Sequence, residues 1–353
     1  MGSSVLTAIA LSLAIPSGAT PPGSSALRSD LSAAARYSAE HQGLALLVWQ
    51  HKLLLERYDN GAKREDRNKA FSVAKSVWGL AAAAAVEEGF LAWDERVSDT
   101  LTEWKTDPRK AAIDVRHLLS MTSGLDPGYA VIDDDATIDK LSAAVPLPSV
   151  AQPGFNFTYG PANMSALGEL FRRKLKDRGT TPLRYLWQRV LSPLGIPGWG
   201  TDKAGNPMMA AGVTFTAREM LALGRAFLDG RGPDGQAIVK TSSLGPLTIP
   251  SSANIMYGLT MWLNRGASEE LSTEVDVEQA LGLGPDFSGW QQGCFSRVAP
   301  PDMLVLLGSY NQRVYIVPSE DLVIVRQGRS MDFKDADFLP LIFEDRTPDY
   351  VME

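Results

Sequence analysis

The sequence predicts a mixed α/β fold of the α+β type, with an antiparallel sheet formed by the two ends of the chain, flanked by helices and carrying an inserted, mostly helical lobe. Two observations predict it. Short apolar runs bounded by Gly, Pro or Asn lie near both ends of the chain, and the segments between them repeat their apolar residues at helical spacing. We expect one domain over residues 24–353, with an α/β lobe at about 24–80 and 255–353 and a helical lobe at about 81–254.

The first 23 residues form either a signal-like segment or an ordinary N-terminal extension. Residues 5–15 are apolar but too few to span a bilayer, and Ser17-Gly18-Ala19 is compatible with signal cleavage. No Lys or Arg precedes the apolar run. A signal peptide at residues 1–19 implies a periplasmic or secreted protein, and an extension implies a cytoplasmic one. No membrane span is expected in either case.

The elements nearest the N-terminus are a helix, a hairpin and a second helix. Residues 25–41 have helical spacing, and residues 44–49 and 53–58 are apolar runs that predict a β-hairpin. An alanine-rich helix then begins at about Ser72 and ends near Gly89.

The middle of the chain is helical and its end returns to strands. Helices are expected at residues 115–121, 164–176, 183–191 and 217–228. Strands are expected at residues 257–263, 303–307, 314–317 and 322–325. A last helix, residues 332–343, is interrupted by Pro340.

Composition excludes several classes of function. The net charge is −7 and no dense Lys/Arg stripe is present, so no nucleic-acid partner is expected. The single cysteine, Cys294, excludes an internal disulfide and a multi-cysteine metal site. With only three histidines, the chain has few possible zinc ligands. Asp133-Asp134-Asp135 lacks the alternating spacing of a calcium loop and favours a solvated loop. No Gly-x-Ser-x-Gly, His-Glu-x-x-His or Gly-rich phosphate motif is present, and we expect neither metal nor cofactor.

Ser72 and Lys75 are candidates for a nucleophile and its base. Residues three apart on a helix share a face, so the two side chains can meet, and no other lysine has a serine three residues before it. A serine needs a base, and a lysine with a pKa near 10.4 becomes one only when burial and the helix N-terminus lower that pKa. The alternative is a helix N-cap serine beside a snorkelling surface lysine.

Tyr159 is a candidate for proton transfer. It follows Pro153-Gly154 on a loop just before a helix, from which a phenol can project into a cleft and relay a proton to a leaving group. A packing role is the alternative for a single loop tyrosine.

Taken together, these motifs resemble the serine β-lactamase/penicillin-binding-protein superfamily. They comprise Ser72-x-x-Lys75, the run from His117 to Leu125, Pro153-Gly154 with Tyr159, Leu167-Gly168, residues 214–230, Tyr257-Gly258-Leu259, and Gly308 followed by Gln312, Pro318 and Leu322-Val323. The resemblance runs from about Gly43 to Gly328 and looks closest to the class C-like branch. That branch includes family VIII carboxylesterases, D-alanyl-D-alanine carboxypeptidases and 6-aminohexanoate-dimer hydrolases.

The resemblance implies a β-lactamase/transpeptidase-like fold and covalent acyl transfer. Ser72 would attack a carbonyl, Lys75 would act as its base and Tyr159 would pass a proton to the leaving group. When Leu306-Leu307-Gly308 is aligned with the family's Lys-Thr-Gly strand, the oxyanion lies between the backbone N–H groups of Ser72 and Ser309.

Two departures from the family pattern concern substrate binding. Pro161 stands where the family often has the Asn of Tyr-x-Asn, and Asn163 either substitutes for it or lies on the helix surface. Leu306 replaces a lysine that helps to bind the substrate carboxylate. Losing that charge-assisted contact costs about 1.5–3 kcal/mol, which favours neutral esters or amides over penicillins. Lys240-Thr241-Ser242 resembles the missing motif but lies in a turn-rich segment, so a solvated loop is expected.

Gly308, Asn163 and Trp290 complete the candidate substrate-binding residues. Trp290 and Phe287 either line an acyl pocket or belong to the core, and His117, amid apolar neighbours, is expected to be structural.

Three functions are weighed. The first is a metal-independent serine hydrolase with an acyl-enzyme on Ser72, acting as a carboxylesterase (EC 3.1.1) on small acyl esters. The second is hydrolysis of amides (EC 3.5), including amino-acid oligomers, D-amino-acid peptides and β-lactams. The third is a catalytically silent binding protein, which Pro161 and Leu306 keep open. A small-molecule ester or amide is the expected partner, and the sequence gives no oligomeric state.

Overall fold

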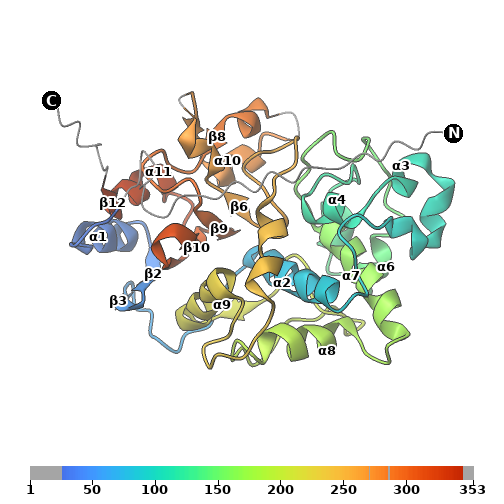
Figure 1. The fold of residues 1–353 in the computed structure, drawn as a ribbon, viewed down its shortest axis with the longest axis horizontal. Coiled ribbons are helices and arrows are strands. Elements are labelled where there is room, and N and C mark those ends of the chain that lie inside the picture. Colours follow the sequence, from blue (N-terminus) through green and yellow to red (C-terminus); the bar gives the residue numbers. More distant parts are fainter. Residues whose placement is uncertain (1–25, 270, 285–286, 345–353) are drawn as a thin grey trace, which may run out of the picture.

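The computed structural model of the chain describes residues 26–344, apart from 270 and 285–286. The signal or extension expected at residues 1–23 lies outside the described residues. The described part consists of two regions (Figure 1). One is a sheet with helices on both faces, and the other, beside it, is mostly helical.

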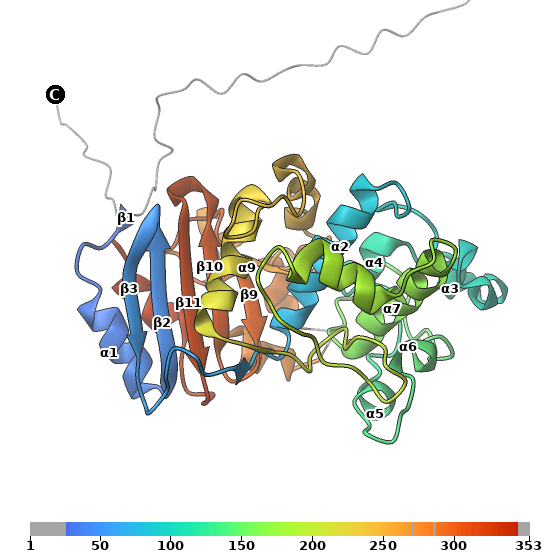
Figure 2. The same cartoon turned by 90° about the horizontal axis from the view of Figure 1, so that it is seen from below.

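A six-stranded antiparallel sheet is built from the two ends of the chain. Its order is β3-β2-β11-β10-β9-β6, and every neighbouring pair is antiparallel. The strands are β2 (Gly43–Gln50), β3 (Lys52–Tyr58), β6 (Trp262–Leu263), β9 (Leu304–Gly308), β10 (Gln312–Val317) and β11 (Leu322–Gly328). The hairpin β2–β3 therefore pairs with the C-terminal strands, which confirms the predicted sheet (Figure 2).

Helices cover both faces of this sheet. Helix α1 (Ser32–Glu40) packs on β2 and on α11 (Asp335–Phe338), while α9 (Ala217–Asp229) crosses β2, β10 and β11 on the other face (Figures 1 and 2). Gly224 lets α9 approach closely, because a Cβ there would collide with the side chains of Val314 and Val323. The expected helical lobe included α9, but its packing joins it to the sheet.

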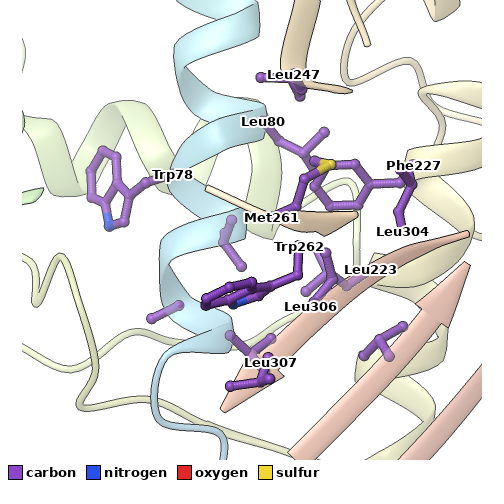
Figure 3. Close-up of a cluster of buried hydrophobic side chains, with 14 of the residues drawn as sticks. Trp78, Leu80, Leu223, Phe227, Leu247, Met261, Trp262, Leu304, Leu306 and Leu307 are labelled. Atoms are coloured by element: carbon purple, nitrogen blue, oxygen red, sulfur yellow. The ribbon is translucent and has the colours of Figure 1, made fainter. Parts of the chain in front are cut away.

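Helix α2 (Val73–Glu87) lies between the sheet and the helical region, and its first thirteen residues are buried. Leu80 faces the cluster of Met261, Leu304 and α9's Phe227, whereas Trp78 points away from it (Figure 3). The Trp78 ring packs edge-on against Phe171, with ring centroids 5.7 Å apart. Burial on all sides explains why an alanine-rich helix is stable here: its stability comes from packing at close approach rather than from an amphipathic stripe.

The helical region is composed of short helices around one long one. They are α3 (Pro108–Ala111), α4 (Val115–Leu119), α5 (Tyr129–Ile132), α6 (Lys140–Ala143), α7 (Pro161–Lys176) and α8 (Pro182–Leu186), which continues as a π-helical turn, Trp187–Leu191. None of the described helices is both long and apolar enough to cross a membrane.

Small elements complete the fold. They are the strand pairs β1 (Ala26–Leu27) with β12 (Phe343–Glu344), β4 (Asn68–Lys69) with β5 (Thr214–Phe215), and β7 (Thr273–Glu274) with β8 (Gly293–Cys294), and the helix α10 (Val277–Leu281). Single 3₁₀ segments lie at Val97–Asp99, Thr102–Thr106, Thr241–Ser243, Gly245–Thr248, Arg265–Ser268, Ser288–Gln291, Pro318–Glu320 and Leu339–Leu341.

Three predicted elements differ most in extent from the observed ones. The first helix begins only at Ser32, because Ala26–Leu27 pairs with the C-terminal β12. The last helix ends at Phe338 and continues as a 3₁₀ turn around Pro340, which has no N–H to extend an α-helix. The strand expected at residues 257–263 is reduced to Trp262–Leu263, because Thr260 adopts a φ of 71° in a tight turn.

Candidate active site

Ser72 lies at the start of α2, on a backbone held in an uncommon conformation. The preceding Phe71 has a φ of 49°, in the left-handed region that non-glycine residues seldom adopt. Ser72 occupies the N-cap position but makes no capping hydrogen bond. Its hydroxyl is therefore available to other groups, which removes the alternative of a simple capping serine.

Lys75 lies one helical turn later, with its amine beside that hydroxyl. Lys75 Nζ is 2.7 Å from Ser72 Oγ and donates to the Ala210 carbonyl oxygen at 3.1 Å. The residue is 4% exposed, so it is not a snorkelling surface lysine. Burial lowers the pKa of Lys75 from 10.5 to about 7, although the negative charge of Asp133 acts in the opposite direction. An amine with this pKa is largely neutral at slightly alkaline pH and can accept a proton from Ser72.

Tyr159 lies over the same amine. Lys75 Nζ is 4.6 Å from the centroid of the Tyr159 ring, which packs edge-on against Tyr257 with centroids 6.0 Å apart. Burial raises the pKa of the Tyr159 phenol well above its ordinary value, while a hydrogen bond with Ser72 acts in the opposite direction. The phenol therefore stays protonated at neutral pH and is able to donate.

The end of β9 approaches the segment before Ser72. Gly308 is the last residue of the strand, and any side chain there would collide with the Ala70 carbonyl oxygen. Within the described part of the chain, neither the Ser72 nor the Ser309 backbone N–H takes part in a hydrogen bond. Two free N–H donors near a nucleophile are the arrangement that stabilises an oxyanion.

These groups border one cavity of about 420 Å³. Ser72, Lys75, Tyr159 and Ser309 all line it, and further lining residues come from both the sheet side and the helical region. A volume of this size is typical of small-molecule sites. The arrangement brings a hydroxyl, a buried amine, a phenol and two backbone N–H groups around one space.

Comparison with known families decides the classification. The family model described as Beta-lactamase matches residues 31–337. The chain belongs to the beta-lactamase family. The resemblance inferred from the motifs is thereby confirmed, and so is the fold.

Solved structures share the fold of this β-lactamase-family protein at low sequence identity. A class C β-lactamase from Rhodobacter sphaeroides is 18% identical, with a TM-score of 0.58 over 87% of this chain and 96% of that one. EstCE1, described as a hydrolase with promiscuous acyltransferase activity, is 16% identical, with a TM-score of 0.62 over 86% and 93%. A D-stereospecific amidohydrolase from Streptomyces is 14% identical, with a TM-score of 0.59 over 88% and 98%.

A curated relative is similar along most of its length. Protein Rv1367c of Mycobacterium tuberculosis is 25% identical over 80% of this chain and 84% of the relative. The name of this relative indicates no activity.

Of the three expected substrate-binding residues, Gly308 lies between two lining residues, Leu307 and Ser309, without lining the cavity itself, and the other two lie elsewhere. Asn163 is 1% exposed; its side-chain oxygen accepts a hydrogen bond from Ser123 Oγ at 2.6 Å and its amide donates to the Thr158 carbonyl. Trp290 is 2% exposed and packs against Trp262 with ring centroids 5.6 Å apart. Neither residue lines the cavity. Asn163 is therefore a buried residue that connects Ser123 and Thr158 through hydrogen bonds, rather than a helix-surface residue. Trp290 belongs to the aromatic core.

Three further expectations concern residues outside the cavity. Leu306 is fully buried, and the Lys240-Thr241-Ser242 segment is exposed, as expected for a solvated turn. His117 forms a capping box with Asp114 at the start of α4, which is a structural role.

The sequence reasoning missed two acidic residues of the cavity wall. Asp133 follows α5 in the loop expected to be merely solvated, and Glu278 lies on the short helix α10; both line the cavity. No local motif marks either residue, because their positions depend on tertiary packing. Among the described residues, no group of three or more His, Cys, Asp or Glu side chains is placed to hold a metal ion.

Proposed function

We propose that this protein is a serine hydrolase that forms an acyl-enzyme on Ser72, with carboxylesterase activity on small acyl esters. The observation that carries the proposal is the buried Lys75 amine, 2.7 Å from the Ser72 hydroxyl and with its pKa lowered to about 7. A base with a pKa near the working pH is effective in general-base catalysis.

Acylation would begin with transfer of the Ser72 proton to Lys75 Nζ as Ser72 Oγ bonds to the carbonyl carbon. The carbonyl oxygen becomes an oxyanion between the N–H groups of Ser72 and Ser309, where preorganised donors stabilise developing charge. The hydrogen bond from Lys75 to the Ala210 carbonyl fixes the direction of the amine during this step.

Collapse of the intermediate would then break the bond to the leaving group. The Tyr159 phenol gives its proton to the departing oxygen and regains one from the Lys75 ammonium. Water repeats the sequence on the acyl-enzyme, with Lys75 removing its proton and Ser72 Oγ leaving with one. Over the full cycle one ester bond and one water molecule are consumed, and each catalytic residue returns to its starting state.

The substrate preference rests on Leu306 and on the size of the cavity. Leu306, which stands where the family pattern has a lysine, is fully buried outside the cavity, and among the described residues that line the cavity Lys75 is the only Lys or Arg, so no second cation is present for a substrate carboxylate. A cavity of about 420 Å³ suits a small acyl group. These features support neutral esters over penicillins, and hydrolysis of a linear amide is the alternative reaction of the same machinery.

The experiment pairs covalent labelling with turnover. A fluorophosphonate probe should add one adduct to the wild-type protein by intact mass analysis and none to Ser72→Ala. The matched control, Ser242→Ala, removes a hydroxyl from the exposed turn and should label like wild type. Rates on p-nitrophenyl butyrate, nitrocefin and a linear anilide should be highest for the ester.

Each contrary outcome has a definite meaning. Absence of an adduct on the wild-type protein would favour a catalytically silent member of the family. Preferred turnover of the anilide or of nitrocefin, lost in Ser72→Ala, would retain the nucleophile and replace the esterase assignment by an amidase or β-lactamase.

A further inference from the structure

The turn between β9 and β10 carries the Ser309 N–H, one of the two proposed oxyanion donors. Gly308 pairs with Gln312, so the turn consists of Ser309, Tyr310 and Asn311. Tyr310 and Asn311 both have a φ of 59°, in the left-handed region that non-glycine residues seldom adopt. Such a backbone conformation costs free energy and persists only where the surrounding structure holds it. The Ser309 N–H therefore lies on a turn that needs support.

Arg326 on β11 supplies part of that support. Its Nη1 donates to the Asn311 carbonyl oxygen at 2.8 Å, and its Nη2 donates to the His41 carbonyl oxygen at 2.7 Å. The guanidinium also lies over the Phe333 ring, 4.0 Å from the ring centroid. These contacts connect the turn to the residue that follows α1 and to the segment before α11.

Arg326 is a buried cation without a carboxylate partner. It is fully buried, and it forms no ion pair within residues 26–344 apart from 270 and 285–286. Its cross-strand partner on β10 is Arg313, which does pair with carboxylates, those of Glu278 and Asp335. Like charges opposite each other on neighbouring strands destabilise a sheet, and an uncompensated buried charge is costly. An apolar residue would fill this position at lower cost, so packing alone does not account for Arg326.

Asn311 holds the same turn through its side chain. The residue is 1% exposed; its Nδ2 donates to the Ser330 carbonyl oxygen at 3.0 Å, and its Oδ1 accepts from Arg313 Nη2 at 2.7 Å. Asparagine also adopts a positive φ more readily than most residues. Together with the hydrogen bond from Arg326, these contacts fix both the main chain and the side chain of Asn311.

The contacts that support the turn leave the Ser309 N–H available. The carbonyl oxygens of Gly308, Tyr310 and Asn311 all accept hydrogen bonds from buried side chains. The Ser309 N–H has no such partner in the part of the chain that the structure describes, and Ser309 lines the cavity. A donor that is held in place before charge develops needs no reorganisation when an oxyanion forms.

We propose that Arg326 and Asn311 are positioning residues, which fix the turn after β9 so that the Ser309 N–H is held where the oxyanion forms. Neither residue lines the cavity, so both act through Ser309 rather than on the substrate. The inference rests on the proposed function, because an oxyanion arises only if Ser72 attacks a carbonyl.

A variant of Arg326 tests this with butylboronic acid as the probe. A boronic acid forms a tetrahedral anion on a serine hydroxyl and so imitates the intermediate that the oxyanion donors stabilise. Arg326→Met keeps a long apolar side chain but removes both hydrogen bonds. Its kcat/KM on p-nitrophenyl butyrate and its affinity for butylboronic acid should both fall by about tenfold or more. Wild-type values of both quantities in folded Arg326→Met would overturn the role of Arg326.

The boronate affinity separates positioning from a general loss of the fold. A purely structural defect lowers the fraction of folded enzyme and hence the measured rate, but the remaining active sites bind the boronate as tightly as wild type. A fall in activity with unchanged boronate affinity would therefore contradict the proposal. The matched control is Arg225→Met, which removes a guanidinium 4.4 Å from the Trp49 ring centroid on α9, outside the turn. It should keep the wild-type kcat/KM and boronate affinity.

Asn311→Gly tests the turn independently of Arg326→Met. Glycine adopts a positive φ without the steric penalty of a Cβ, so the backbone of the turn is accommodated. The variant loses the hydrogen bonds to Ser330 and Arg313, and its boronate affinity should fall as well. Unchanged boronate affinity would remove Asn311 from the positioning role. If Arg326→Met does not fold, Asn311→Gly decides the proposal.

Failure of this inference is distinguishable from failure of the proposed function. If the fluorophosphonate probe labels wild-type Ser72 and butyrate is hydrolysed, while both variants keep their boronate affinity, only the positioning role is wrong. If the wild-type protein is not labelled and does not bind butylboronic acid, the hydrolase assignment is wrong, and the positioning role fails with it.

Discussion

Lys75 Nζ lies 2.7 Å from Ser72 Oγ, with the lysine 4% exposed at the N-terminal turn of a buried helix. Two opposing demands meet in this pair. The amine must be shielded from water so that its pKa falls and it can lose its proton. It must also remain hydrogen-bonded, because an isolated buried polar group is costly. The Ala210 carbonyl satisfies the second demand without adding negative charge that would restore the pKa of Lys75.

The first prediction concerns the pH dependence of turnover. Lys75 is the proposed base and must be neutral, so kcat/KM on p-nitrophenyl butyrate should rise with pH through an apparent pKa near 7 and then level off. The phenol of Tyr159 has its pKa raised by burial, so no decline from its ionisation is expected up to pH 9. A stopped-flow or plate-reader profile from pH 5 to 9 checks this. A flat profile would exclude Lys75 as the titrating base.

The second prediction concerns proton delivery by Tyr159. Tyr159→Phe keeps the ring over Lys75 but removes the phenolic proton, so kcat/KM should fall by about a hundredfold, in the range typical of general acid catalysis. Tyr310→Phe is the matched control, because Tyr310 is 45% exposed and does not line the cavity. Steady-state kinetics of both variants test whether Tyr159 delivers the proton. A kcat/KM near the wild-type value in Tyr159→Phe would assign the residue to packing alone.

The third prediction concerns the close approach of β9. Gly308→Ala introduces a Cβ that collides with the Ala70 carbonyl oxygen, so either the strand or the segment before Ser72 must move. Because Ser309 N–H moves with the strand, kcat should fall at least tenfold, as for loss of an oxyanion donor. Gly198→Ala is the control, since a Cβ there meets nothing within 4 Å. Unchanged kcat in Gly308→Ala would remove Ser309 from the proposed oxyanion site.

Local pattern was sufficient to predict one part of this site and insufficient for the other. Ser72 and Lys75 are three residues apart on one helix, so their meeting follows from helical geometry alone. Glu278 reaches the cavity because Arg313, 35 residues away in the chain, holds it there, and no local motif encodes that contact. Burial of Trp290 depends in the same way on Phe157 and Trp262, which come from distant segments.

The fourth prediction concerns Asn163, expected from the sequence at the substrate. Asn163→Ala leaves the buried Ser123 hydroxyl without its acceptor, so the free energy of unfolding should fall by about 1–3 kcal/mol. Since Asn163 does not line the cavity, KM on p-nitrophenyl butyrate should stay near the wild-type value. Denaturant titration and kinetics separate the two effects. Unaltered stability with a large rise in KM would instead place Asn163 at the substrate.

The last prediction concerns what the buried Lys75 costs in stability. The pKa of Lys75 is about 7 in the folded protein and about 10.5 when exposed in the unfolded chain, so between these values the unfolded state binds more protons. The free energy of unfolding therefore rises with pH across this window and is lowest below pH 7, where the folded state must hold a buried charge. Lys75→Met removes the penalty, and at pH 6 it should be more stable than wild type by a few kcal/mol at most. The difference should shrink toward pH 10.

Urea titrations of the wild type, Lys75→Met and the exposed-site control Lys52→Met across pH 6–10 measure this difference. Only the Lys75 variant should gain stability at low pH, and it should lose turnover, since the group that destabilises the fold is the one proposed to activate Ser72. If Lys75→Met and wild type differ by the same amount at every pH, the amine is not the buried titrating group on which the proposed mechanism depends.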